Sequence, residues 1–286
     1  MYTVLIIIDN IYPIFKSDTR YGLKATQLFY SHAFVFAACC VLLLTILLLV
    51  KPAIKNAIFY KYSIWLSILT VTTLRSRALG CIMVFWLIIY YIYIRKKTFS
   101  IWMFLLFIPA MIAIGWNQIY YYFFSDIQFN SARYQLFVKS FQVAMDSFPF
   151  GAGFATFGSY FSSIYYSPLY YRYGISMVHG LQEGNAWFVN DSFWPMILGQ
   201  FGFIGFASMI IVVYLLYKEI QMCRKINLFS YSSCLFIFFY LMIESTSSSA
   251  FVHPLSIPFA LIIGHVFAEN KRLAFANFNR KTIKKI

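Results

Sequence analysis

The sequence predicts an all-α polytopic membrane protein with about seven transmembrane helices and one large external loop that contains short helices. Three observations predict this fold class. The composition is 61% hydrophobic and only 11% charged, whereas a soluble domain has roughly 45–50% apolar and about 25% charged residues. Apolar runs long enough to cross a bilayer recur along the chain of 286 residues,. The basic residues fall between these runs, as they do in multi-pass proteins.

Seven segments approach the apolar length of about 20 residues that a spanning helix needs. They are Leu28–Val50, Ala57–Leu74, Ala78–Ile94, Ser100–Asn117, Phe193–Tyr217, Leu228–Glu244 and Ala250–Ala268. The basic sequence Arg75-Ser76-Arg77 divides the second from the third, so we expect two spans joined by a tight turn. The chain then has an N-terminal transmembrane part with four spans (1–117), a large extracytoplasmic loop (118–192), and a C-terminal transmembrane part with three spans and a basic cytoplasmic tail (193–286).

The distribution of basic residues predicts the orientation. With the C-terminal tail in the cytoplasm, seven spans place most of the 23 Lys and Arg residues inside, as the positive-inside rule requires. Residues 1–27 then lie outside, where they resemble the end of a span followed by an external loop. We therefore expect further spans to precede Met1.

Charge and cysteine content exclude other classes. A net charge of +14 would suggest nucleic acid in a soluble protein, but here the charge marks topology, so we expect no nucleic-acid partner. The five cysteines show no metal-ligand spacing and are interpreted as small apolar residues,. We expect neither a metal nor a cofactor.

The loop 118–192 is the only long polar connection, so we expect it to have helices of its own and a function. Within Asn130–Phe148 the apolar residues recur at helical spacing, with Ser131 able to cap the start and Pro149 and Gly151 ending the helix,. This pattern predicts an amphipathic helix at the outer membrane surface.

Two further patterns follow that helix. Gly151 and Gly153 allow either a simple tight turn or a close backbone approach to a ligand,. A tyrosine-rich stretch comes next and is explained either by an interfacial aromatic belt or by a platform for sugar rings. Its members are Tyr160, Tyr165, Tyr166, Tyr170, Tyr171 and Tyr173.

Four arginines lie on the predicted external side, namely Arg75, Arg77, Arg133 and Arg172. Arginine presents a planar fork that binds phosphate oxygens in pairs, so these residues are candidates for binding the phosphate group of a substrate, and lipid headgroups are the alternative partner.

Three other groups of the loop can accept a proton, namely Asp191, Glu183 and His179,. Asp191 can instead cap the helix that begins near Phe193, and His179 can be an ordinary surface residue. Glu244, near the outer end of the sixth span, is a candidate buried carboxylate.

Four sequence pieces, in this order and spacing, resemble the O-antigen polymerase and O-antigen ligase superfamily. They are the Ser/Arg-rich turn Thr72–Gly80, the arginine, helix and Pro-x-Gly-x-Gly turn from Arg133 to Gly153, the loop exit Asn190–Trp194 with Leu198–Gly205, and Glu244 with its serine run before Pro254. Ligases commonly have His-Asn where this chain has Asn190-Asp191, which favours a polymerase over a ligase.

The resemblance implies a metal-independent glycosyltransferase of the bacterial cytoplasmic (inner) membrane. Such an enzyme transfers a glycan from a polyprenyl-pyrophosphate donor to an acceptor glycan on the external face, as in O-antigen or capsule synthesis. Its partners would be the polyprenyl-pyrophosphate-linked oligosaccharide, membrane lipids and other polysaccharide-export proteins. The family usually has more spans, and a chain that lacks them would be inactive alone.

Two other classes stay open. A multi-pass transporter or lipid-linked glycan flippase should have charged or Gly/Pro-broken segments near mid-bilayer. Here the spans are interrupted only by His32, His265 and the prolines Pro109, Pro195 and Pro258, which are expected to kink them. A structural subunit of an envelope complex would give no reason for four external arginines.

The orientation predicts that residues 118–192 are external and Arg95–Lys97 cytoplasmic. Single cysteines at Ser163 and at Lys97, in a background without the native cysteines, should differ when intact cells are treated with an impermeant thiol reagent. We expect labelling at 163 only. Labelling at 97 but not at 163 would show that the predicted orientation is the wrong way round.

Overall fold

The computed structural model describes residues 2–12, 14–15, 18–20, 22–96, 109, 116, 120 and 131–283. The protein is mostly helical (70%), and within these residues four helices are long and apolar enough to cross a membrane. The four are Ala33–Ala53, Ser76–Ile94, Phe193–Cys223 and Leu228–Ser245. The expectation of a helical protein with membrane-type helices is confirmed at this level.

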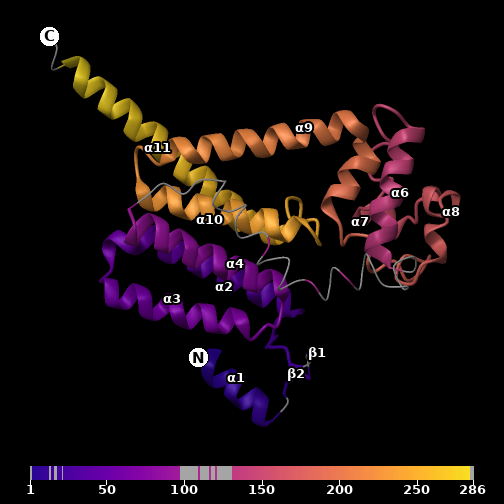
Figure 1. Ribbon diagram of the computed structural model, residues 1–286, viewed down its shortest axis with the longest axis horizontal. Coiled ribbons are helices and arrows are strands. Elements are labelled where there is room, and N and C mark those ends of the chain that lie inside the picture. The colour runs from indigo at the N-terminus through magenta and orange to yellow at the C-terminus, as the bar shows by residue number, and fades with distance from the viewer. Residues whose placement is uncertain are drawn as a thin grey trace. The chain divides into compact units, whose positions relative to one another are not determined.

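The structural elements follow the order shown in Figure 1. They are α1 Tyr2–Ile11, β1 Thr19–Arg20, β2 Leu23–Lys24, α2 Ala33–Val50, η1 Lys51–Ala53, α3 Asn56–Val71, α4 Ser76–Ile88, η2 Ile89–Ile94, α6 Ala132–Asp146, α7 Tyr160–Ile164, α8 Pro168–Arg172, η4 Ile175–Met177, α9 Phe193–Cys223, α10 Leu228–Ser245, η5 Pro254–Ser256 and α11 Ile257–Ile283.

The chain forms two compact units. The first, called the helical unit, comprises Met1–Leu106, Tyr217–Tyr240 and Pro254–Ile286. The second, called the loop unit, comprises Phe107–Leu216 and Leu241–His253. Each unit is described by itself.

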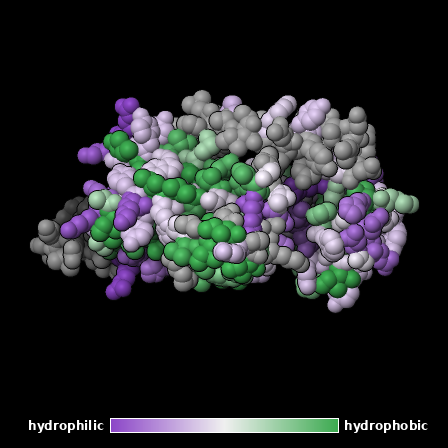
Figure 2. Space-filling view, turned by 90° about the horizontal axis from the view of Figure 1, so that it is seen from below, coloured by the Kyte–Doolittle hydropathy of each residue, from purple (hydrophilic) through white to green (hydrophobic). Residues whose placement is uncertain are grey.

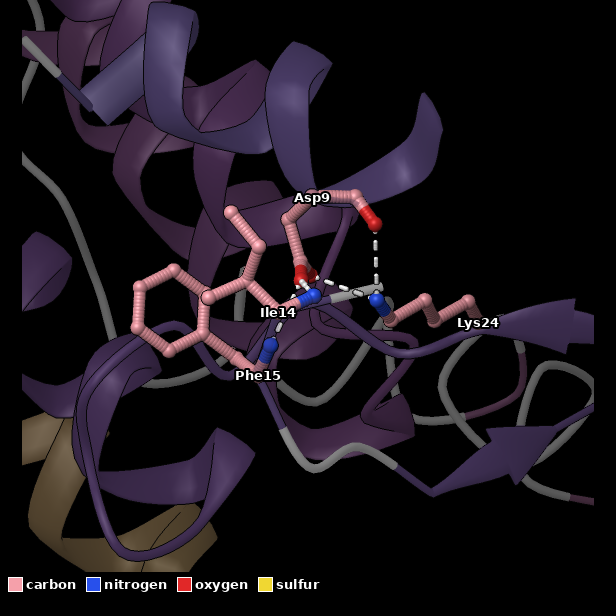
Figure 3. A network of polar contacts seen from close by, with 4 residues as sticks. All are labelled: Asp9, Ile14, Phe15 and Lys24. Carbon is pink, nitrogen blue, oxygen red and sulfur yellow. Dashed lines mark hydrogen bonds and ion pairs between the residues drawn. The ribbon is translucent and has the colours of Figure 1, made fainter. Parts of the chain in front are cut away.

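A buried carboxylate organises the start of the helical unit (Figure 3). Asp9, near the end of α1, accepts hydrogen bonds from the backbone N–H groups of Ile14 and Phe15 at 3.0 and 2.8 Å. It also forms an ion pair of 2.7 Å with Lys24 of β2. Because a buried charge is stable only when it is paired and hydrogen-bonded, this network fixes the β1–β2 pair to α1.

In the helical unit α10 is the most buried of the long helices, and its residues 230–240 are all buried. Serines of α10 bond across to neighbouring helices: Ser232 shares a 2.6 Å hydrogen bond with Tyr93, and Ser233 donates to the carbonyl of Thr45 at 3.5 Å. Phe236 packs edge-on against Phe85 of α4, with ring centroids 5.3 Å apart. Small polar residues of this kind let helices approach and bond in an apolar medium.

The helices of the helical unit differ from the predicted spans at several ends. The first begins at Ala33 rather than Leu28, which has a positive φ of 53°. Two helices, α3 and α4, meet at Arg75-Ser76-Arg77 as expected, but α3 has only 16 residues and is not among the four helices that can cross a membrane. The last helix begins at Ile257, because residues 250–256 form turns and a 3-10 helix, so the predicted start at Ala250 is wrong. The predicted span Ser100–Asn117 lies largely outside the described residues.

The loop unit has its own apolar core beneath α6, and the expected helix there is confirmed. Nine buried side chains form this core: Leu136, Val143, Phe157, Tyr166, Tyr170, Ile175, Val178, Leu181 and Val189. Ser131 stands before the first residue of α6, but its hydroxyl makes no capping bond and has no hydrogen-bond partner among the residues that the structure describes. The expected cap is therefore wrong.

Helix α9 is broken at Gly202, and the turn after α6 forms hydrogen bonds with the backbone at this break. Gly202 has φ 62° and ψ −160°, so the helix is interrupted there. The carbonyls of Gly199 and Gln200 accept hydrogen bonds from the N–H groups of Ala152 and Gly153 at 3.0 and 2.9 Å. In an unbroken helix these carbonyls would bond to residues four positions later. The turn after α6 therefore replaces the bonds that the break removes.

The replacement is reciprocal. Ile204 lies just beyond the break, and its N–H donates to the carbonyl of Pro149 at 3.4 Å. Backbone groups left unbonded in lipid are costly, so a broken helix near a membrane needs such partners. The break also explains the length of α9, whose 31 residues would extend about 46 Å at about 1.5 Å per residue. The segment after Gly202 suffices alone to cross a hydrocarbon core of about 30 Å.

Prolines do not cause this break. Pro195 lies in the first turn of α9 and Pro258 in the first turn of α11, where a missing N–H costs no helical hydrogen bond. The expected kinks at these two residues are therefore wrong.

The molecular surface has the apolar character expected of a membrane protein. Figure 2 shows hydrophobic residues over broad areas of the face in view.

The docked turn predicts an unusually large effect of Gly151→Ala. A Cβ at this position would lie 2.3 Å from the backbone nitrogen of Gly202, and φ is +75°. Gly174 is the matched control, because φ is +70° there and the added Cβ meets nothing within 4 Å. We expect Gly174→Ala to lower stability by about 1 kcal/mol and Gly151→Ala by about 3 kcal/mol or more.

Thermal unfolding in detergent, followed by loss of the monodisperse elution peak, measures both changes. Equal shifts for the two variants would mean that the turn does not dock tightly in the break.

Candidate functional site

The structure brings together two residues that the sequence singled out separately, Arg133 and Asp191. Arg133 is the second residue of α6, and Asp191 lies two residues before α9. A guanidinium nitrogen of Arg133 donates to a carboxylate oxygen of Asp191 at 3.1 Å. The Arg133 side chain is 25% exposed and that of Asp191 32%. The pair is therefore partly shielded from water but open to a ligand.

The loop exit that holds Asp191 is fixed on both sides. Ser249 donates to the carbonyl of Asn190 at 2.9 Å, and the indole N–H of Trp194 donates to the hydroxyl of Ser245 at 3.1 Å. Phe193 packs on Phe251 with ring centroids 5.0 Å apart. Two of these contacts come from the serine run after Glu244 and the third from Phe251 just beyond it, so the third and fourth pieces of the family resemblance meet in space.

His253 lies in the same segment and was not assigned a role from sequence. Burial lowers its pKa, and the nearby carboxylate of Glu244 opposes that shift. A neutral imidazole and a carboxylate therefore lie in the segment that holds the loop exit. In sequence His253 is one of four scattered histidines, and only the packing of residues 241–253 in the loop unit indicates its place.

Arg172 lies elsewhere in the loop unit. Its guanidinium is 3.9 Å from Asp146, with 68% of the Arg172 side chain and 49% of the Asp146 side chain exposed. The hydroxyl of Tyr173 donates to the same carboxylate at 2.6 Å. Partial burial and this bond raise the pKa of Tyr173. The contact is a surface ion pair, of a kind that adds little stability.

The two arginines are attached to opposite ends of one helix. Arg133 is in the first turn of α6, and Asp146, the partner of Arg172, is its last residue. At about 1.5 Å per residue these ends are roughly 20 Å apart. The structure therefore does not bring Arg133 and Arg172 to one phosphate group.

The other predicted site residues are dispersed. Glu183 is exposed and accepts a hydrogen bond from the hydroxyl of Tyr171, which raises the pKa of Tyr171 to about 12. His179 is exposed in a turn of the loop unit. Arg75 and Arg77 belong to the helical unit, where Arg75 forms a 3.2 Å ion pair with Asp18.

The tyrosine-rich stretch serves two purposes. Tyr166 and Tyr170 are buried in the core, where Tyr166 donates to the carbonyl of Leu181 and Tyr170 accepts from the N–H of Gly158. Tyr160 and Tyr165 are exposed. Tyr165 lines an open, mainly apolar hollow of about 460 Å³. Neither a continuous belt nor a single sugar platform describes all six residues.

Sequence reasoning assigned no role to Gln200, which is buried in α9. Its side-chain oxygen accepts from the N–H of Ala155 at 3.0 Å, and its amide nitrogen donates to the carbonyl of Phe157. Gln200 thus extends the contact between the turn and the break. A lone glutamine in an apolar run was the available signal. In the described part of the chain, no three His, Cys, Asp or Glu side chains gather as a metal site would require.

Comparisons of the chain with protein-family models, with curated proteins and with solved structures find no match.

The Arg133–Asp191 pair predicts a measurable coupling between two distant positions. In a double-mutant cycle of Arg133→Gln and Asp191→Asn, we expect the double variant to lose less stability than the two single variants together. The coupling should be about 0.5–1 kcal/mol and should shrink at high salt. Unfolding in detergent gives the change in unfolding free energy for each of the two single variants and for the double variant.

Arg172→Gln with Asp146→Asn is the matched control, because its charges are farther apart and more exposed. We expect its coupling to be near zero. Strict additivity at Arg133 and Asp191 would contradict the pairing.

Proposed function

We propose that the chain is a polysaccharide polymerase of the bacterial inner membrane. It would transfer a glycan from a polyprenyl-pyrophosphate donor to an acceptor glycan on the external face, in the presence of membrane lipids and other export proteins. The observation that carries the proposal is the Arg133–Asp191 contact of 3.1 Å at the exit of the loop. It joins a phosphate-binding group to a proton acceptor in one partly shielded place.

The two residues have complementary roles in this reaction. Transfer breaks the bond between the anomeric carbon and the pyrophosphate, and negative charge develops on the departing oxygens. The guanidinium of Arg133 can donate two parallel hydrogen bonds to those oxygens. The carboxylate of Asp191 accepts the proton of the attacking hydroxyl. Glu183 and His179 remain candidates for the base by residue type, but among these three Asp191 is the one that contacts Arg133.

The start of α6 adds to the attraction for an anion. Arg133 lies in its first turn, where the backbone dipoles leave partial positive charge, and the Ser131 side chain does not cap that turn,. A pyrophosphate at Arg133 would therefore meet two positive features of the same helix end.

A transporter or lipid-linked flippase is the competing class, and the break at Gly202 is the feature it would use. In transporters, broken helices present unbonded backbone groups to the substrate. Here the carbonyls of Gly199 and Gln200 are already occupied by the turn after α6. Because its carbonyls bond to the turn, the break at Gly202 is better explained by a structural role. The Arg133–Asp191 ion pair is therefore the better candidate for the chemical step.

Arg133→Lys and Asp191→Asn test the proposal. Lysine keeps the charge but loses the fork, and asparagine keeps the shape but cannot take a proton. We expect each to lower chain extension about a hundredfold, measured on polyprenyl-pyrophosphate-linked repeat units in proteoliposomes with any coding sequence that precedes Met1 included.

Lys139→Gln is the control on the same helix, and Arg172→Lys should reduce the rate less than Arg133→Lys because Arg172, in α8, contacts the other end of α6. Near-parental rates in both Arg133→Lys and Asp191→Asn, with normal elution profiles, would reduce the pair to a structural contact.

A further inference from the structure

Large apolar side chains form an exposed row on the loop unit. The row begins on α6 and continues through the turn that follows it. Six residues, called here the aromatic ridge, form it: Phe137, Phe141, Met145, Phe148, Phe150 and Phe154. Phe150 is 70% exposed and Phe154 75%. Single exposed apolar residues are ordinary, but an adjoining row of this size marks a surface with a partner.

The ridge is distinct from the core of the loop unit. In α6, Leu136 and Val143 are fully buried in that core, whereas Phe137 and Phe141 are exposed on a different face of the helix. The two rings of the exposed face contact each other, with centroids 5.4 Å apart. Helix α6 thus has two apolar faces, and the described part of the chain buries one of them.

Two ring contacts continue the ridge onto α9. Phe148 lies 6.0 Å from Phe203, and Phe154 lies 6.2 Å from Phe201, between ring centroids. Helix α9 is one of the four described helices that can cross a membrane. Its apolar side chains beyond this point, among them Ile204, are exposed in the same way. The ridge is therefore an extension of a surface whose natural solvent is lipid.

The positive charge of Arg133, at one end of the aromatic ridge, is what a site at the phospholipid headgroups would require. Arg133 precedes Phe137 by four residues, a spacing that puts both on neighbouring positions of one helix face. The order in a bilayer is the same, because a layer of negatively charged phosphates lies next to the apolar acyl chains. We infer that the aromatic ridge is immersed in the membrane leaflet from which α9 starts, with lipid acyl chains covering Phe137 to Phe154 and Arg133 at the depth of the phosphates. This inference does not depend on the proposed reaction.

Environment-sensitive labels can measure the depth of the ridge. Full-length protein without its five native cysteines is given single cysteines at Phe141 or Phe150, labelled with the fluorophore NBD, and reconstituted into vesicles of phosphatidylethanolamine and phosphatidylglycerol. We expect blue-shifted emission, strong quenching by brominated lipids and weak quenching by aqueous iodide. A label at Ile211, exposed on α9, is the positive control.

Gln142→Cys is the matched control, since Gln142 is exposed on α6 next to Phe141 but outside the ridge. Its label should show the opposite preference, with iodide the better quencher. Iodide quenching at 141 and 150 equal to that at 142 would mean that the ridge faces water. Protection from both quenchers would mean that protein, such as a second copy of the chain, covers it. Either outcome overturns the inference, whatever the activity of the Arg133 variants.

Discussion

Hydrogen bonding between the turn after α6 and the break in α9 determines how the loop unit is built. Backbone groups near lipid cannot remain unbonded, so the break at Gly202 and the turn at Gly151 depend on each other. Their contact fixes the C-terminal end of α6 beside the break, at the end of the first part of α9. The Arg133–Asp191 pair fixes the N-terminal end of α6 at the start of α9. Helix α6 therefore lies beside the first part of α9, before the break at Gly202, whereas the long second part of α9 runs in a different direction (Figure 1).

Hydropathy and basic residues predicted most of the helices, because apolar runs need no knowledge of long-range contacts. The turn at Arg75-Ser76-Arg77 was found in this way, as was α6. The errors concern backbone geometry. Pro195 was expected to kink a helix but lies in the first turn of α9, whereas the actual break occurs at Gly202, one of three glycines from residue 199 to residue 205. Only the docked turn distinguishes that glycine from its neighbours, and the turn lies about 50 residues earlier in the chain.

The candidate site was predictable in its residue types and unpredictable in its geometry. Arg133 and Asp191 were each selected for their chemistry, but a contact across 58 positions follows from tertiary packing alone. For the same reason Arg133 and Arg172 looked like one site in sequence and lie at opposite ends of α6. The apolar positions of α6 predicted a single amphipathic face. They divide into a buried face and the aromatic ridge, and hydropathy cannot separate two faces that are both apolar.

The two faces and the first turn of α6 together explain why chemistry would occur at this place. The buried face fixes the helix to a rigid core, so its orientation does not depend on lipid. The ridge then determines the depth of that core in the leaflet, because any rotation or lift would expose large aromatic side chains to water. Arg133 is on the same helix, and its depth therefore follows from the ridge rather than from its own contacts. A donor whose pyrophosphate is held at the bilayer surface by a polyprenyl chain varies little in depth either. If the proposed transfer takes place, an arginine preset to that depth would meet the leaving group without the entropy loss of searching for it, which is the advantage that preorganised sites have over flexible ones.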